Sequence, residues 1–259
     1  MADKIYLRPA GFVDAPFGLD GKAARLAGGL LWFSQVEVIA DGAGATDLVS
    51  VAGIDRFIAD LGADQRPAVA AAWANIIAPR LPLKLGDRVV RLDQPQVVGI
   101  VNATPDSFSD GGRYGDATAA GNAGFAMAAA GAALVDVGGE STRPGAQPVW
   151  EEDEKARVLP VLEQLIGSGT AVSLDTRKAA VMEAALAIGP LMINDVSALT
   201  YDPRAAEVVA RSACPVVLMH HQGPPETMQE APRYARPVLL EVYDWLDRRI
   251  EAAVAAGIE

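Results

Sequence analysis

The stretch VVGIVNATPDSFSDGG, residues 97–112, begins with a run of β-branched apolar residues and ends in a loop rich in Asp, Ser and Gly. Four further apolar runs follow along the chain, and each ends in polar residues or glycines: ALVDVGG (133–139), TAVSLDT (170–176), LMINDVS (191–197) and PVVLMHH (215–221). In each run, apolar residues occupy odd as well as even positions. Such runs are typical of parallel strands that are buried on both faces. Together the five runs predict a parallel β-sheet.

Alanine-rich segments of helical character alternate with these runs. They are Ala117–Gly131, Glu151–Leu165, Lys178–Ala187, Asp202–Arg211 and Val238–Ala256. A regular succession of strand and helix is the signature of an α/β fold with parallel strands. The many small apolar residues suit close packing of these helices on the sheet.

Polar residues gather at the C-terminal end of every run. They are Asn102, Gly138 and Gly139 with Glu140, Asp175, Asn194 with Asp195, and His220. In a closed (β/α)8 barrel that end carries the active site and many strands contribute to one pocket, whereas in an open sheet only the strands at the switch point contribute. Polar residues at five strand ends therefore favour the TIM-barrel type. A barrel needs eight strands, so five runs predict a partial barrel over residues 85–259.

Residues 1–84 lack this alternation and form an N-terminal extension whose role stays open. Within it, the pattern predicts a strand over Leu30–Ala40 and a helix over Gln65–Ile77 that begins near a proline. The segment LGDRVVRL, residues 85–92, predicts one short strand just before the barrel.

The composition excludes several classes of function. The 33 acidic residues outnumber the 22 basic ones, for a net charge of −11, and such a chain repels a nucleic-acid backbone. The single cysteine, Cys214, cannot form an internal disulfide and is interpreted as a small buried residue, which indicates the cytoplasm. The N-terminal residues lack the apolar stretch of a signal peptide, and no segment has the roughly 18 apolar residues needed to span a bilayer.

An aromatic residue, Phe108, lies in the middle of the polar loop that follows the first run. A solvated turn explains the glycines and aspartates of this loop but not the aromatic ring. Loops that cover a bound substrate use such residues. The loop therefore favours a ligand site at this end of the sheet.

Five segments resemble the signatures of dihydropteroate synthases, in the order that this family has them. They are VNATPDSFSDGG (101–112), VDVGGESTRPGA (135–146), SLDTRKAAVMEAAL (173–186), MINDVSAL (192–199) and MHHQGPPETMQ (219–229). The resemblance covers roughly residues 85–259. It implies a transferase of folate biosynthesis that condenses 6-hydroxymethyl-7,8-dihydropterin pyrophosphate with p-aminobenzoate, giving 7,8-dihydropteroate and pyrophosphate.

The resemblance also implies roles in holding the leaving group. Asn102 matches the residue that contacts the metal and the pyrophosphate, and a carbonyl oxygen suits Mg²⁺. Thr142 and Arg143, in the glycine-rich loop after the second run, match groups that hold phosphate oxygens. Without the resemblance, a surface salt bridge would be the ordinary interpretation of Arg143.

Other positions match the two substrate pockets. Asp175 and Asn194 correspond to residues that read the polar edge of the pterin, and Met219 is placed to pack against its ring. From the residues alone, Asp175 also fits a helix cap and Met219 fits a core position. Phe108, Thr142 and Pro144 correspond to the region that forms the p-aminobenzoate pocket, and Asp106 and Ser107 of the first loop are further substrate-binding residues. His220 and His221 are interpreted as structural or pocket-edge groups on opposite faces of a strand, because adjacent strand residues alternate.

The chain departs from the family pattern near its C-terminal end. The family has three further strands with an Asp-Pro-Gly-x-Gly-Phe segment, a Ser-Arg-Lys segment and a terminal Arg-x-His, and residues 222–259 contain none of these. A pterin-binding fragment or paralogue without turnover therefore stays an alternative, and a pterin-binding methyltransferase domain is disfavoured by the first loop. For a full-length family member the resemblance implies a homodimer, with sulfonamides as competitors of p-aminobenzoate. We expect residues 1–259 alone to be poorly stable or to aggregate.

Overall fold

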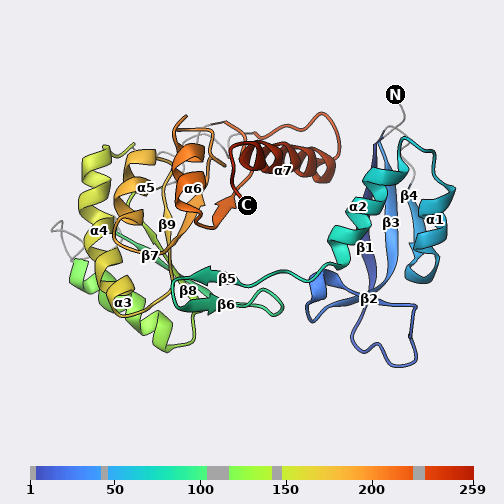
Figure 1. Ribbon diagram of the computed structural model, residues 1–259, viewed down its shortest axis with the longest axis horizontal. Coiled ribbons are helices and arrows are strands. Elements are labelled where there is room, and N and C mark those ends of the chain that lie inside the picture. The colour runs from blue at the N-terminus through green and yellow to red at the C-terminus, as the bar shows by residue number, and fades with distance from the viewer. Residues whose placement is uncertain (1–3, 42–45, 104–116, 142–147, 224–230) are drawn as a thin grey trace. The chain divides into compact units, whose positions relative to one another are not determined.

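The computed structural model describes residues 4–41, 46–103, 117–141, 148–223 and 231–259, and it divides into two compact units (Figure 1). The first unit comprises Met1–Pro82 and Arg91–Pro95, and the second comprises Leu83–Val90 and Gln96–Glu259. Across the described residues, no helix is both long enough and apolar enough to cross a membrane.

The first unit is an antiparallel sheet covered by two helices. Its central strand β3 (Trp32–Ala40) pairs with β1 (Ile5–Val13) along one edge, and with β2 (Ala24–Arg25) and β4 (Thr46–Ser50) along the other. Two 3-10 turns, η1 (Leu26–Gly28) and η2 (Val51–Gly53), precede the helices α1 (Ile54–Asp60) and α2 (Arg66–Ile77). The predicted strand at 30–40 and helix at 65–77 are confirmed.

The core of this unit lies between the sheet and its helices. Phe33 and Val36 of β3 are fully buried against Ile54, Ile58 and Val69 of the helices. The ring of Phe33 also meets the ring of Trp73 edge to face, with the centroids 6.0 Å apart. Aromatic contacts of this geometry add to the stabilisation that burial provides.

Residues 83–90 form a hairpin, so the prediction of one strand over 85–92 is wrong. Strands β5 (Leu83–Leu85) and β6 (Arg88–Val90) are joined by a two-residue turn that begins at Gly86. The φ of Gly86 is 60°, a left-handed conformation that glycine adopts without strain and that tight hairpin turns require. Leu85 and Val90 pack against residues at the start of the parallel strands and thus cover that end of the sheet.

The second unit is built on a five-stranded parallel sheet in the order β11-β10-β9-β8-β7. Its strands are β7 (Val98–Asn102), β8 (Leu134–Gly138), β9 (Val172–Asp175), β10 (Met192–Asp195) and β11 (Val216–Leu218). Its helices are α3 (Ala117–Ala129), α4 (Glu151–Gly167), α5 (Ala179–Leu186), α6 (Ala205–Ser212) and α7 (Val238–Ala255). All five predicted strands and all five predicted helices are confirmed. Each strand pairs with its neighbour in the chain, which is the order of a (β/α)8 barrel, although the described strands do not close into one.

The two faces of this sheet differ in burial. Helices α3 to α6 lie along one face (Figure 1), where Val135, Val137, Leu174 and Ile193 are fully buried in the largest core. On β7 the side chain of Ile100 points to the other face and is 61 % exposed. Among the described residues, burial on both faces is therefore correct for β8 to β10. It is wrong for β7 and for β11, whose Val217 is 38 % exposed.

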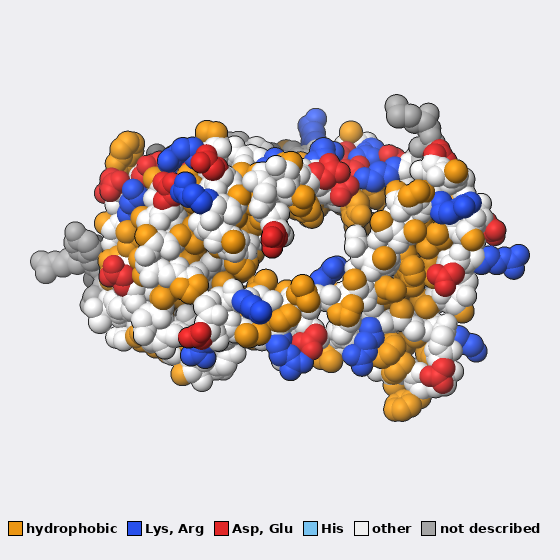
Figure 2. Space-filling view, viewed as in Figure 1, with side chains coloured by type: hydrophobic (Ala, Val, Ile, Leu, Met, Phe, Trp, Pro, Cys, Tyr) orange, Lys and Arg blue, Asp and Glu red, His pale blue; other side chains and the backbone are white. Residues whose placement is uncertain are grey.

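The visible surface carries charges of both signs. Figure 2 shows lysine and arginine side chains interspersed with aspartate and glutamate over this face, with apolar side chains between them. No large patch of one sign forms among the coloured residues in this view. A broad basic surface, which binding to a phosphate backbone requires, is not seen on this face.

Candidate functional site at the strand ends

The carboxyl ends of the parallel strands place polar side chains in one row. The register pairs Asn102 with Gly138, Gly138 with Asp175, and Asp175 with Asn194. Because side chains alternate along a strand, residues paired across neighbouring strands point to the same face. Three predicted site residues, Asn102, Asp175 and Asn194, are thus brought together on the face opposite the helices.

Gly138 lies between two of these side chains. A Cβ atom added at this position would lie 3.7 Å from Oδ2 of Asp175 and 3.9 Å from Oδ1 of Asn102. Both oxygens therefore border the same small space above the backbone of β8. A side chain at position 138 would contact both oxygens, whereas glycine leaves them without such a contact.

Asp136, one layer below the row, belongs to the site and was missed in the sequence. Its carboxylate accepts a short hydrogen bond from the Ser173 hydroxyl and a 3.1 Å hydrogen bond from Nδ2 of Asn194. The second bond orients the amide of Asn194, so that its Oδ1 is the atom left to accept from a ligand. The available signal was an acidic residue inside the otherwise apolar run ALVDVGG.

The carboxyl group of Asp175 has an unusual protonation equilibrium. Burial, followed by the negative charges of Asp136, Glu154, Asp195 and Glu140, raises the pKa of Asp175 from 3.8 to about 7. Desolvation and like charges both disfavour the ionised form, which explains the direction. Near neutral pH this carboxyl group can therefore be present in either form.

The alternative role of Asp175 as a helix cap is wrong. The first backbone N–H of α5, that of Ala179, donates to Oδ2 of Asp202 at 2.9 Å. The preceding N–H, that of Lys178, donates to the hydroxyl of Thr176 at 3.3 Å. Since neighbours cap α5, the carboxyl group of Asp175 is left for the open face of the sheet.

Asp195 points the other way and holds a turn. Its carboxylate accepts from the backbone N–H of Ser197 at 2.7 Å and of Leu199 at 3.0 Å. Ala198 and Leu199 have φ values of 52° and 60°, which are strained for residues with side chains. Asp195, together with Arg249 of α7, whose Nε donates to the Ala198 carbonyl at 2.9 Å, stabilises this strained connection beside the site.

The positions of Met219, His220 and His221 differ in part from the prediction that they lie in a strand. The strand ends at Leu218, so Met219 and the two histidines follow it, and Met219 is half-buried. His220 and His221 both approach the ring of Trp245, with centroid distances of 5.0 and 6.5 Å, so the prediction that they lie on opposite faces is wrong. Both border a cavity of about 240 Å³, as pocket-edge groups do.

Six predicted site residues lie outside the described part of the chain. They are Asp106, Ser107, Phe108, Thr142, Arg143 and Pro144. The described residues reach Ala103 before the first of these loops, and they end at Ser141 and resume at Pro148 around the second. Cys214 is buried, as expected, and burial raises the pKa of its thiol to about 11.

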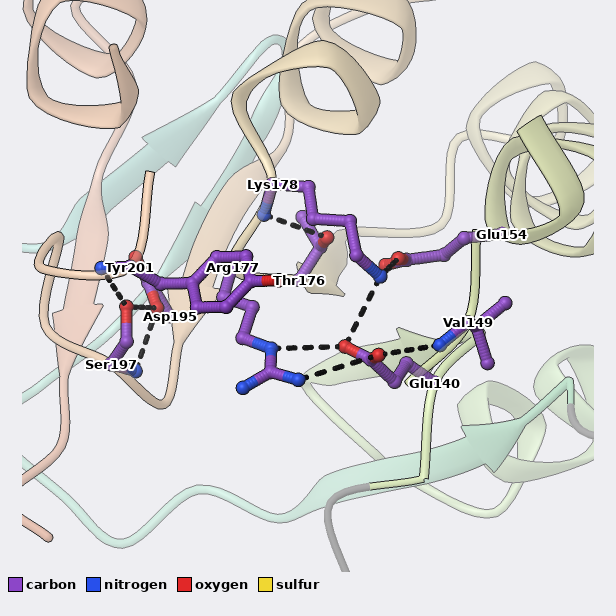
Figure 3. Close-up of polar contacts among 9 residues, drawn as sticks. All are labelled: Glu140, Val149, Glu154, Thr176, Arg177, Lys178, Asp195, Ser197 and Tyr201. Atoms are coloured by element: carbon purple, nitrogen blue, oxygen red, sulfur yellow. Dashed lines mark hydrogen bonds and ion pairs between the residues drawn. The ribbon is translucent and has the colours of Figure 1, made fainter. Parts of the chain in front are cut away.

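Four buried charged side chains contact one another beside the carboxyl end of β8 (Figure 3). Glu140 follows β8, Glu154 lies in the first turn of α4, and Arg177 and Lys178 follow β9. All four residues are less than 10 % exposed, and Glu154 is fully buried. We call them the ion-pair cluster.

These features define an α/β protein of the (β/α)8-barrel type with a polar site at the carboxyl ends of its strands. The sequence profile of a family described as pterin binding enzymes matches residues 98–259. The chain therefore belongs to the family of pterin binding enzymes.

The similar proteins described next are dihydropteroate synthases. The dihydropteroate synthase of Neisseria meningitidis serogroup B is 49 % identical over 177 residues, which are 65 % of this chain and 60 % of that protein. The solved dihydropteroate synthase of Xanthomonas albilineans with 4-aminobenzoic acid has a TM-score of 0.63 at 49 % identity, covering 69 % of this chain and 63 % of that one. That of Yersinia pestis with a sulfonamide drug has a TM-score of 0.64 at 43 % identity, covering 69 % and 65 %. The chain thus spans about 60 % of the length of the first of these relatives.

Proposed function

We propose that the chain has the activity of a dihydropteroate synthase, a transferase of folate biosynthesis. The reaction joins 6-hydroxymethyl-7,8-dihydropterin pyrophosphate to p-aminobenzoate and releases pyrophosphate. Asp175 and Asn194 of the row, with Asp136 below them holding the amide of Asn194, carry this proposal. The family match across all five parallel strands and the name shared by the relatives support it.

In this proposal the row reads the polar edge of the pterin. A pterin presents neighbouring N–H donors and a carbonyl acceptor on one edge of a flat ring. The ionised carboxylate of Asp175 accepts from the donors, and Oδ1 of Asn194 accepts a further one because Nδ2 is held by Asp136. Met219 packs against the face of the ring.

Magnesium fits the residues at the end of β7. No three His, Cys, Asp or Glu side chains of the described ranges are grouped to hold a metal. Mg²⁺ needs no such cage, because it keeps several waters and takes one or two protein oxygens together with substrate phosphates. Oδ1 of Asn102 would be such an oxygen, and the ion would supply charge neutralisation for the leaving pyrophosphate. Thr142 and Arg143 would hold further phosphate oxygens.

The bond-making step needs little from the protein beyond positioning. The aniline nitrogen of p-aminobenzoate forms a bond to the methylene carbon of the pterin, the carbon–oxygen bond to pyrophosphate breaks, and the nitrogen loses a proton. Phe108, Thr142 and Pro144 would surround p-aminobenzoate, and Asp106 and Ser107 would contact a substrate from the first loop. Sulfonamides carry the same aniline group, so we propose them as competitors. We also propose a cytoplasmic location and, for a full-length family member, a homodimer.

A second candidate is pterin binding without turnover. The side chains proposed to contact the pterin, Asp136, Asp175 and Asn194, lie in the described part of the chain. Pterin binding by these residues can therefore be measured separately from turnover.

The deciding experiment measures pyrophosphate release by the purified chain with dihydropterin pyrophosphate and Mg²⁺, with and without p-aminobenzoate. We expect release that depends on p-aminobenzoate, and a fall of about 100-fold for Asn102→Ala, within the range for losing one group that stabilises developing charge. Asn75→Ala is the matched control, because this asparagine lies in the first unit.

Binding separates the two candidates. Calorimetric titration with the dihydropterin pyrophosphate would detect pterin binding independently of turnover. Binding that Asp175→Ala weakens, without any release of pyrophosphate, would favour the second candidate. Absence of both binding and release would contradict both.

A further inference from the structure

We propose that Glu140 is a positioning residue that holds together the two ends of the loop after β8, residues 140 and 149. The other members of the ion-pair cluster keep the Glu140 carboxylate in place. This inference rests on the proposed function, because it concerns the affinity of the same site for p-aminobenzoate. Glu140 makes no hydrogen bond to Asn102, Asp175 or Asn194 among the described residues, and its charge is the last of the causes that raise the pKa of Asp175. Its main effect on p-aminobenzoate is therefore transmitted through other residues.

Glu140 is the residue at which the contacts of the cluster meet (Figure 3). Its Oε1 accepts a 2.9 Å hydrogen bond from the backbone N–H of Val149, which lies at the far end of the loop. Its Oε2 is 3.1 Å from Nε of Arg177 and 3.2 Å from Nζ of Lys178. One carboxylate that begins the loop therefore binds the residue that ends it.

The remaining members of the cluster hold this carboxylate from two directions. Lys178 also makes a short contact with the carboxylate of Glu154, so it bridges the two acids (Figure 3). The guanidinium of Arg177 lies over the ring of Tyr201, 4.2 Å from its centroid. The cluster thereby ties together the connections that follow β8, β9 and β10, all at the end of the sheet that carries the site.

The backbone at the start of the loop is held as well. Nη1 of Arg157, in α4, donates to the carbonyl of Gly139 at 2.9 Å. The position of Gly139 is so close to α4 that an added Cβ would lie 2.7 Å from a methyl carbon of Val158. Residues 139 and 140 are therefore fixed against α4 by a bond and by close packing.

Stability alone does not account for such a cluster. Taking four charges out of water is costly, and replacing a buried ion pair by apolar residues of similar volume is often neutral or stabilising. Burial opposes the charge of Glu140, yet the Val149 N–H and the charges of Lys178 and Arg177 outweigh it and hold the pKa of Glu140 below its ordinary value. The glutamate thus stays ionised and orientated, which is what an anchor for Val149 requires.

The test compares two charge-neutral double variants. Glu140→Met/Arg177→Met removes the anchor of Val149 and leaves the Lys178–Glu154 pair. Glu154→Leu/Lys178→Met removes the other pair and leaves Glu140 bonded to both Arg177 and Val149. Glu152→Gln/Lys155→Met, on the exposed side of α4, is the control for the loss of an ion pair as such.

Two measurements are made on each variant. Hydrogen–deuterium exchange follows the amide of Val149, and titration or steady-state kinetics gives the affinity for p-aminobenzoate and for the dihydropterin pyrophosphate separately. For Glu140→Met/Arg177→Met we expect exchange at Val149 and KM for p-aminobenzoate each to rise about tenfold or more, the loss expected for a hydrogen bond to a charged group. The affinity for the pterin changes less than the KM for p-aminobenzoate, because Glu140 makes no hydrogen bond to the row and acts on it only as the last cause of the raised pKa of Asp175. Glu154→Leu/Lys178→Met shows smaller changes in both.

The outcomes separate this inference from the proposed function. Unchanged exchange at Val149 in Glu140→Met/Arg177→Met overturns the positioning role, and so does faster exchange with an unchanged KM for p-aminobenzoate. Equal loss of affinity for both substrates also overturns it, because that pattern indicates general unfolding of the site. A wild-type chain that binds neither substrate overturns the proposed function, while exchange at Val149 still decides whether Glu140 holds the loop.

Discussion

Asp175 connects the pH of the solution to both stability and binding. Its pKa is raised to about 7 from an ordinary value of 3.8, first by burial and then by neighbouring carboxylates. Between these two pH values the folded chain keeps a proton that the unfolded chain has released. The folded state is therefore progressively destabilised as the pH rises from about 4 to about 7 by this group.

We predict that Asp175→Asn removes this dependence. Relative to the wild type, the free energy of unfolding of Asp175→Asn should increase as the pH rises through this window, by up to about 1.4 kcal/mol for each pKa unit of the shift. Urea unfolding at several pH values measures it, with Asp60→Asn, an exposed aspartate of the first unit, as the control. A constant difference between wild type and Asp175→Asn from pH 4 to 8 would contradict the shifted pKa. Pterin affinity of the wild type should also rise with pH through 7, because only the ionised carboxylate accepts two hydrogen bonds from the ring.

At the residue scale, the sequence predicted those site residues that are polar and directly follow an apolar run. Asn102, Asp175 and Asn194 were predicted as site residues from their place after apolar runs, and the structure brings them into one row. Asp136 was missed because it lies inside a strand, where its direction depends on the pairing with Ser173. That pairing involves a residue 37 positions away, which a local pattern does not contain.

The start of α4 is the element on which the site most depends. Gly139 packs against the first turns of this helix, so we predict that Gly139→Ala costs about 1–3 kcal/mol of unfolding free energy, as overpacking does. Gly167→Ala, in the last turn of the same helix, is the control, because an added Cβ there meets nothing within 4 Å. This second change should be neutral or stabilising, since alanine favours a helix over glycine. Thermal or urea unfolding of both variants decides it, and equal effects would contradict the packing argument.

Among the elements, the parallel strands and their helices were predictable because the succession of apolar run, polar strand end and helix recurs along the chain. The hairpin β5–β6 was not, because most of its first strand, Leu83–Leu85, lies before the predicted segment. Gly86 was the signal for the turn, and its meaning depends on a φ value that the sequence does not contain. The strand pattern likewise did not distinguish β7, which is apolar on both sides yet covered by described residues on only one.

At the scale of the whole molecule, the open face of the sheet governs solubility. Ile100 is 61 % exposed there and Val98 is 47 % exposed, while β7 and β11 leave unpaired edges in the described sheet. Exposed apolar faces and free strand edges promote association. This agrees with the expectation that the chain alone is poorly stable or aggregates, which remains a prediction.

We predict concentration-dependent association of the purified chain, with binding of a hydrophobic dye. Val98→Thr/Ile100→Thr should reduce both, because threonine keeps the β-branched shape of the strand residues and lowers their hydrophobicity. Light scattering over a range of protein concentrations measures the effect. Leu48→Thr, an exposed strand position of the first unit, is the control. A monodisperse, cooperatively melting wild-type monomer would contradict the prediction.

The order of the parallel sheet has a consequence for how the chain folds. Every described parallel strand pairs only with the strand before or after it in the sequence, so paired residues such as Val98 and Leu134 are separated by one strand–helix unit. Closing a loop of that length costs less entropy than pairing strands from the two ends of the sheet. During synthesis, β8 can pair with β7 as soon as both have left the ribosome, and each later strand can add to an existing edge. The second unit can thus grow one strand and one helix at a time, from β7 toward β11.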